Sequence, residues 1–147
     1  MEAAKAECNC LDGRVRKSTL PVFQAAPESG APPLKRLLLP QGELAQFHHG
    51  EPAMRYIAFV ELREGTVRGN HFHKCKDEWI YLLSGEVRLV VEDPQSKKRE
   101  FMEVQTGELV VIAPGVAHAL KVAAPGQAVE FSATTFDPAD TYRYTLV

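Results

Sequence analysis

Cysteine is scarce in this chain, and its scarcity constrains both the fold and the compartment. The 147 residues include three cysteines, an odd number at low density, which argues against a disulfide framework and indicates a reducing compartment. Cys8 and Cys10 form a single Cys-x-Cys pair, and no second pair completes a tetrahedral zinc site. We therefore expect Cys8 and Cys10 to be free thiols in a loose tail, and Cys75 to lie in an outward-facing turn.

Long apolar runs and a strong charge of either sign are also missing. No apolar stretch approaches the ~20 residues that span a bilayer, and residues 1–7 carry two acids without the apolar core of a signal peptide. The net charge is −2, so the chain has no basic footprint for nucleic acid or for an anionic membrane surface. We expect a cytoplasmic protein that binds a small-molecule ligand or substrate, but neither nucleic acid nor a membrane.

Helical periodicity is absent too, apart from a possible turn around residues 137–140. From Leu34 onward, short β-branched and aromatic segments alternate with turn signals, which predicts an all-β antiparallel sandwich or barrel. Residues 25–33 are rich in proline, which removes backbone donors and fixes φ. We therefore divide the chain into a flexible or edge-docking tail over residues 1–33 and a barrel over residues 34–147. Within the tail, only residues 20–23 are expected to dock.

Turn signals also set the limits of individual strands. Residues 79–83 and 87–91 are expected to form two strands, because Ser84-Gly85 between them is a turn signal. Another strand is expected over residues 129–136, ending at an Asp-Pro pair.

Histidine and glutamate occur in a pattern that predicts a metal site. His71 and His73 stand two apart in a strand-like run, so their side chains point to the same face. Glu78 follows after a short link and can face both histidines across a strand pair. His118 comes just after the turn that ends a strongly apolar strand. Three imidazoles and one carboxylate suit one divalent ion such as Fe, Mn, Ni, Zn or Cu; His71 and His73 alone would be exposed strand histidines.

The spacing of these residues resembles the two sequence motifs of the cupin superfamily. The first motif requires a glycine, a His-x-His pair, a glutamate and a second glycine, and its fixed positions are matched by Gly65, His71, His73, Glu78 and Gly85. The second motif requires two glycines and a histidine, matched by Gly107, Gly115 and His118. The glycines are expected at turns, where a positive φ is easily adopted.

The second motif departs from the family pattern at two positions. Ala113 stands where proline is usual, with Pro114 one place later, and Val122 stands where asparagine is usual. Neither position is a metal ligand in the family, so the departures concern the loop and not the site. The resemblance covers about residues 50–136. It implies an antiparallel jelly-roll β-barrel in which the two motifs meet around the metal.

Strand parity assigns the side chains around Glu78. Ile80 and Leu82 share its face and should line the interior, whereas Trp79 and Tyr81 should cover the outer face or a dimer contact. The tail also carries apolar residues with little core of their own. We therefore expect a homodimer in which a sheet face or an exchanged N-terminal strand buries apolar area.

Three classes of function remain open, because this barrel hosts many activities. The run Arg68-Gly69-Asn70-His71 resembles the Arg-Gly-x-His motif of cupins in surface-polysaccharide pathways, such as deoxysugar epimerases and ketoisomerases. The lead hypothesis is therefore isomerisation or epimerisation of a small polar, carbohydrate-type metabolite, with Arg68 as the candidate residue for binding a diphosphate. Arg68 as a plain surface charge is the alternative. An Fe(II)-dependent dioxygenase is the second class, and a non-catalytic protein that binds a small ligand is the third.

Overall fold

β-Strands make up almost all the regular structure of residues 7–147, which the computed structural model describes. The larger sheet contains, in chain order, β1 (Glu7–Cys10), β2 (Val15–Thr19), β6 (Tyr56–Leu62), β7 (Val67–Phe72), β8 (Glu78–Glu92), β9 (Arg99–Gln105), β10 (Glu108–Ile112), β11 (Ala117–Ser132) and β12 (Tyr142–Arg143). A separate sheet contains β3 (Val22–Phe23), β4 (Lys35–Leu39) and β5 (Gly42–Gln46). Two short 3-10 helices are η1 (Leu11–Gly13) and η2 (Pro138–Asp140). No helix within residues 7–147 is long and apolar enough to cross a membrane.

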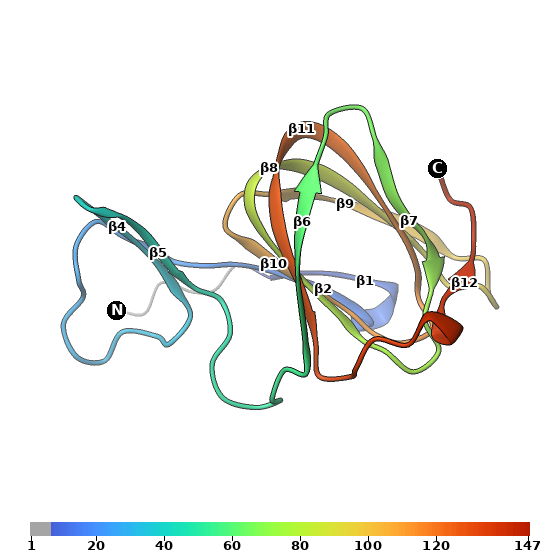
Figure 1. The fold of residues 1–147 in the computed structure, drawn as a ribbon, viewed down its shortest axis with the longest axis horizontal. Coiled ribbons are helices and arrows are strands. Elements are labelled where there is room, and N and C mark those ends of the chain that lie inside the picture. Colours follow the sequence, from blue (N-terminus) through green and yellow to red (C-terminus); the bar gives the residue numbers. More distant parts are fainter. Residues whose placement is uncertain (1–6) are drawn as a thin grey trace.

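Two long strands fold the larger sheet over on itself. β8 and β11 pair with each other along most of their length and curve around the interior (Figure 1). The first half of β8 also pairs with β10 and its second half with β9. Likewise, the first half of β11 pairs with β7 and its second half with β6. The result is two antiparallel layers joined by the same two strands, which confirms the expected all-β jelly-roll. Among the described strands, only β3 and β4 of the smaller sheet pair in parallel.

Ser84-Gly85 is a bend within one continuous strand and not a turn between two strands. Opposite it, the register of β11 against β8 shifts at three points between Val122 and Ala128. Gly126 lies so close to this bend that an added Cβ would stand 1.9 Å from the carbonyl oxygen of Ser84. The expectation of two strands was wrong, because bulges and glycines can bend a strand without ending it. β11 also begins earlier and ends earlier than the strand expected over residues 129–136.

The N-terminal segment belongs to the barrel. β2 pairs with β10, and β1 pairs with β2, so this segment adds two strands at one edge of the sheet. Leu11 and Val15 are fully buried in the core, and Cys10 is buried beside them, while Cys8 is exposed. The expectation of a loose tail was therefore wrong for Cys8 and Cys10, which both lie in β1, and docking is not confined to residues 20–23. Pairing of β2 with β10 supplies an order that the local sequence does not encode. Residues 1–6 of the expected tail lie outside the described residues.

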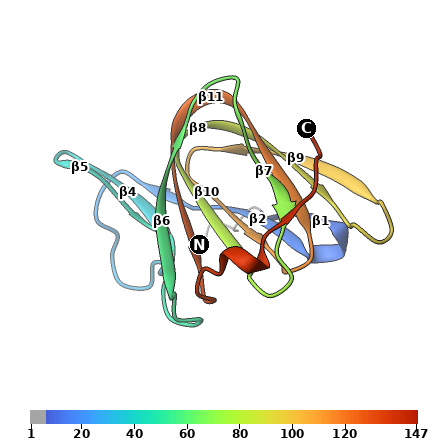
Figure 2. The same cartoon turned by 45° about the vertical axis from the view of Figure 1, so that its right-hand side comes forward.

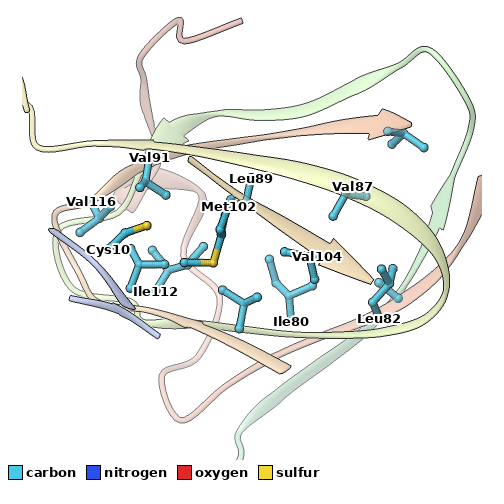
Figure 3. Packing of buried hydrophobic residues seen from close by; sticks show 14 of the residues in the cluster. Cys10, Ile80, Leu82, Val87, Leu89, Val91, Met102, Val104, Ile112 and Val116 are labelled. Atoms are coloured by element: carbon cyan, nitrogen blue, oxygen red, sulfur yellow. The ribbon is translucent and has the colours of Figure 1, made fainter. Parts of the chain in front are cut away.

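Aliphatic side chains from both layers fill the barrel interior. Figure 3 shows Val87, Leu89 and Val91 of β8 among the residues that pack between the strands. Ile80 and Leu82 belong to the same buried cluster, which confirms the parity assigned to them. Full burial of a valine or leucine side chain contributes about 1.5–3 kcal/mol, so this cluster is the main source of the fold's stability.

A second cluster covers the outer face of the layer that contains β10 and the first half of β8. Tyr81 is buried there, and the ring of Phe47 stacks on it with the centroids 4.4 Å apart. Trp79 packs against Phe131, and the rings of His48 and Trp79 make an edge-to-face contact. Trp79 and Tyr81 therefore lie on the outer face as expected, but residues of the same chain cover them. The β4–β5 hairpin extends to one side of the barrel next to this face (Figure 1).

Candidate metal centre

The four residues expected to bind metal come together inside the barrel. His71 lies in β7, His73 follows that strand, Glu78 opens β8, and His118 is the second residue of β11. Each offers one nitrogen or oxygen atom, and these four atoms all lie within 4.8 Å of one another. The pairing of β7 with β11 places His118 directly opposite His71, which explains how two motifs distant in the sequence meet.

Backbone carbonyl groups orient two of the three imidazoles. Nδ1 of His73 donates to the carbonyl oxygen of Asp140 at 2.9 Å, and Nδ1 of His118 donates to that of Val116 at 3.0 Å. A carbonyl oxygen can only accept, so Nδ1 must carry the proton in both rings, and Nε2 is left facing the cluster. The buried Nε2 of His73 has no hydrogen-bond partner. Nε2 of His118 and Oε2 of Glu78 have only each other.

Burial and mutual charge set the protonation of this cluster. Burial and the neighbouring charge of His118 lower the pKa of His71 to about 4, so His71 is neutral near pH 7 and its lone pair is free. Burial alone would raise the pKa of Glu78, but the charge of His118 and its hydrogen bond hold that pKa well below its usual range. In turn, the Glu78 carboxylate raises the pKa of His118 against the effect of burial. A metal ion and a proton would therefore compete for His118 and Glu78.

The cluster borders a cavity of about 270 Å³ in the barrel. Its walls are mostly apolar and include Ile80 and Leu82, as the strand parity predicted. Arg68 also borders the cavity, but its side chain is exposed and its Nε donates to the carbonyl oxygen of Glu61 at 3.1 Å. Arg68 therefore lies where the cavity meets solvent, and not beside the four clustered residues.

Three polar residues near the cluster were not identified from the sequence. Lys76 is buried on the cavity wall, although the turn around Cys75 was expected to face outward. Glu130 is brought to the same wall by β11, and burial together with a hydrogen bond to Glu78 raises the pKa of Glu130 to about 8. The available signal for Glu130 was its place in the strand expected over residues 129–136, where alternate side chains share a face. Cys75, which precedes Lys76 in the chain, is exposed as expected.

Asp140 is the third of these residues, and it ties the link between the ligands to the C-terminal part of the chain. Its carboxylate accepts from three consecutive backbone N–H groups, those of Lys74, Cys75 and Lys76, at 2.9–3.1 Å. η2, which contains Asp140, lies beside the loop that follows β7 (Figure 2). The sequence indicated a helical turn here, but nothing in it showed which loop this turn would contact.

A family match agrees with this arrangement. The sequence profile of the Cupin domain matches residues 58–134, which is more than half of the chain. The chain belongs to the cupin family. In this cupin, the matched region contains all four clustered residues and both long strands. No curated protein matches the sequence.

Solved structures with a similar fold include enzymes that act on nucleotide-linked sugars. dTDP-6-deoxy-D-glucose-3,5-epimerase RmlC from Legionella pneumophila Philadelphia 1 has a TM-score of 0.70 at 13% identity, over 95% of this cupin and 77% of that chain. dTDP-4-dehydrorhamnose 3,5-epimerase from Sulfolobus tokodaii has a TM-score of 0.71 at 16% identity, over 95% and 81%. A 3,4-ketoisomerase from Helicobacter canadensis has a TM-score of 0.65 at 11% identity, over 75% and 86%. At these identities the similarity is one of fold.

Proposed function

We propose that this cupin is a metal-dependent enzyme that holds one divalent transition-metal ion on His71, His73, Glu78 and His118. The observation that carries the proposal is the buried Nε2 of His73, which points at three other potential ligand atoms and has no hydrogen-bond partner. Buried polar atoms are nearly always paired, so an atom left alone here favours a missing partner. Three imidazoles and one carboxylate suit Fe, Mn, Ni, Zn or Cu.

The reaction we propose is isomerisation or epimerisation of a small carbohydrate-type metabolite that carries a carbonyl group. When bound, the ion would supply a Lewis acid for an oxygen atom of the substrate. The chain's own part is to exclude water with the apolar walls and to offer groups that exchange protons, such as Glu130. Similarly folded proteins named as sugar epimerases and ketoisomerases support this choice.

Metal analysis followed by a solvent-exchange assay tests the proposal. Protein exchanged into metal-free buffer and reloaded should retain about one ion per chain in elemental analysis. Incubated in D₂O with a panel of nucleotide-linked 4-keto sugars, the loaded protein should introduce deuterium at the carbon next to the carbonyl, which mass spectrometry detects. Deuterium uptake by none of them would contradict the reaction, and a protein that retains no ion would contradict the metal site.

A second candidate function is oxygen chemistry at Fe(II) on a small apolar substrate. The observation that favours it is the mostly apolar lining of the cavity, which offers few hydrogen-bond partners to a sugar. Oxygen consumption by iron-loaded protein, without solvent exchange into any sugar, would support this candidate. Tight binding of a ligand without turnover would instead support a non-catalytic role.

Replacement of Arg68 tests whether the substrate carries a diphosphate. Loss of a charged hydrogen-bond donor to phosphate costs about 1.5–3 kcal/mol, so Arg68→Ala should weaken nucleotide-sugar binding by roughly 10–100-fold. Metal content should stay unchanged, because Arg68 is not among the clustered residues. Isothermal titration measures both proteins, with Arg88→Ala as the control since Arg88 does not border the cavity. Equal affinities of Arg68→Ala and wild type would show that Arg68 does not contact the diphosphate.

We also propose that the protein is a homodimer, with β6 at the contact. Ile57 and Phe59 on this strand are 70% and 64% exposed, and β11 is the only strand with which β6 pairs among the described residues. A second copy would bury both side chains. Sedimentation velocity at micromolar concentration should give a dimer for wild type and a monomer for Ile57→Ser/Phe59→Ser. A monomeric wild type would refute the proposal.

A further inference from the structure

Lys76 is a buried lysine beside the proposed metal centre, and the proposed function assigns it no task. Its side chain is 3% exposed. Nζ lies 3.2 Å from Oε1 of Glu130, 3.8 Å from Oε1 of Glu78, and 4.6 Å from the centre of the Tyr56 ring. The contact with Glu130 is a hydrogen bond, whereas Glu78 is held in an ion pair and Tyr56 offers the face of its ring. The ammonium group of Lys76 is therefore placed between two carboxylates, one of which is a potential metal ligand.

A buried ion pair is weak evidence for stability, so stability alone is not a sufficient reason for a lysine at this position. Removing a charged group from water is expensive, and apolar side chains of similar volume can often replace buried ion pairs without loss of stability. The surroundings offer such packing, because Nζ also lies 5.8 Å from the centre of the Phe136 ring, and the nearby cavity walls are apolar. A buried lysine here is better explained by what it does to a neighbouring carboxylate.

The two oxygens of Glu78 have different partners. Oε2 lies against Nε2 of His118, inside the cluster of potential ligands. Oε1 lies 3.8 Å from Nζ of Lys76, and the Glu78 carboxylate also shares a hydrogen bond with Glu130. We propose that Lys76 is a positioning residue that holds Oε1 of Glu78, so that Glu78 offers Oε2 alone to the metal. Glu130 supplies the second oxygen that keeps the ammonium group in place. This inference rests on the metal site of the proposed function.

The backbone of Lys76 is fixed by the same residue that orients His73. The N–H of Lys76 donates to Oδ2 of Asp140 at 3.1 Å, and the carbonyl oxygen of Asp140 accepts from Nδ1 of His73 at 2.9 Å. Asp140 therefore orients the imidazole of His73 and also fixes the position of Lys76, which holds Glu78. Such outer partners commonly tune the affinity of a metal site.

Cobalt binding to the full chain tests the role of Lys76. Chelator-treated wild type and Lys76→Met are titrated with Co²⁺, and the visible absorption gives both the affinity and the ligand environment of the ion. Lys76→Met should bind Co²⁺ about 10–100-fold more weakly, the usual effect of losing an outer partner. Its spectrum should also change, because a released Oε1 alters the oxygen donors. Loss of a positive charge alone would tighten cation binding, so weaker binding reports lost positioning.

Two further variants and a melting curve distinguish lost positioning from a change of charge or a failure to fold. Lys76→Arg keeps a positive donor and should restore the wild-type spectrum. Lys74→Met removes an exposed lysine two residues away, whose Nζ lies 4.4 Å from the centre of the Tyr142 ring, and should behave as wild type. Metal-free Lys76→Met should still melt in one cooperative transition, at a lower temperature than the wild type because the buried carboxylates lose their partner. Equal or tighter Co²⁺ binding by Lys76→Met with an unchanged spectrum would overturn the role of Lys76 alone. Wild type that takes up no Co²⁺ would overturn the metal site and this role with it.

Discussion

A His118→Ala variant is expected to lose its metal ion under conditions in which the wild type keeps about one per chain. His118 is 2% exposed, and its Nδ1–H donates to the carbonyl oxygen of Val116. This hydrogen bond fixes the ring so that Nε2 faces the other potential ligands. Removing the imidazole of His118 takes away one of four potential ligands and also leaves the carboxylate of Glu78 without its ion-pair partner. Loss of an outer partner costs about 10–100-fold in affinity, and loss of a direct ligand should exceed this range.

Elemental analysis after gel filtration measures this loss, and the melting temperature provides a second readout. A ligand that binds only the folded state stabilises it in proportion to the logarithm of its concentration over Kd, so metal should raise the melting temperature of the wild type and not that of His118→Ala. His49→Ala is the matched control, because His49 is exposed and lies outside the cluster. A His118→Ala protein that still retains one ion per chain would rule out the site as described.

A Leu11→Ala variant is expected to lose about 2–5 kcal/mol of folding free energy. Leu11 is 0% exposed and packs in the main core cluster, between the two strands of the N-terminal segment. Its backbone N–H also donates to the carboxylate of Glu100, so the side chain is held against the barrel. Because domains of this kind are stable by about 5–15 kcal/mol in all, such a loss is a large share of the total.

Urea denaturation of metal-free protein measures this effect, with an unchanged slope required for a clean comparison. Leu44→Ala is the same substitution at a residue that is 50% exposed, and it should change stability by less than about 0.5 kcal/mol. Equal stability of Leu11→Ala and Leu44→Ala would mean that the N-terminal segment contributes nothing to the core.

The grouping of His71, His73 and Glu78 could be predicted from short-range rules, whereas His118 was placed with them through the resemblance to the second cupin motif. Parity along a strand puts two residues on one face, and the motif spacing sets where the chain turns back. The face of Ile80 follows from the same parity. Burial of Lys76 follows from no such rule, because it depends on Glu130, which lies 54 positions away in the sequence and reaches it only through the pairing of β11 with β8.

The strands of the N-terminal segment escaped prediction for a related reason. Residues 7–19 contain cysteine, asparagine, glycine and charged residues in place of an alternating apolar pattern, so their strand preference is weak. The hydrogen bonds of β10 to β2 supply the order that the local sequence lacks. The proline-rich stretch after residue 24 suggested a tail because proline cannot continue a strand, yet here it only connects β3 to β4.

The alternation along the first half of β8 also restricts how this strand can change during evolution. Glu78, Ile80 and Leu82 face the cavity, while Trp79 and Tyr81 face the aromatic cluster outside. Insertion or deletion of one codon within this half would reverse every later side chain, putting aromatic rings into the cavity and aliphatic residues onto the outer face. Substitutions can accumulate here one at a time, but a change in length disrupts both compartments at once. We therefore expect this half-strand to tolerate substitutions but not a one-residue insertion or deletion.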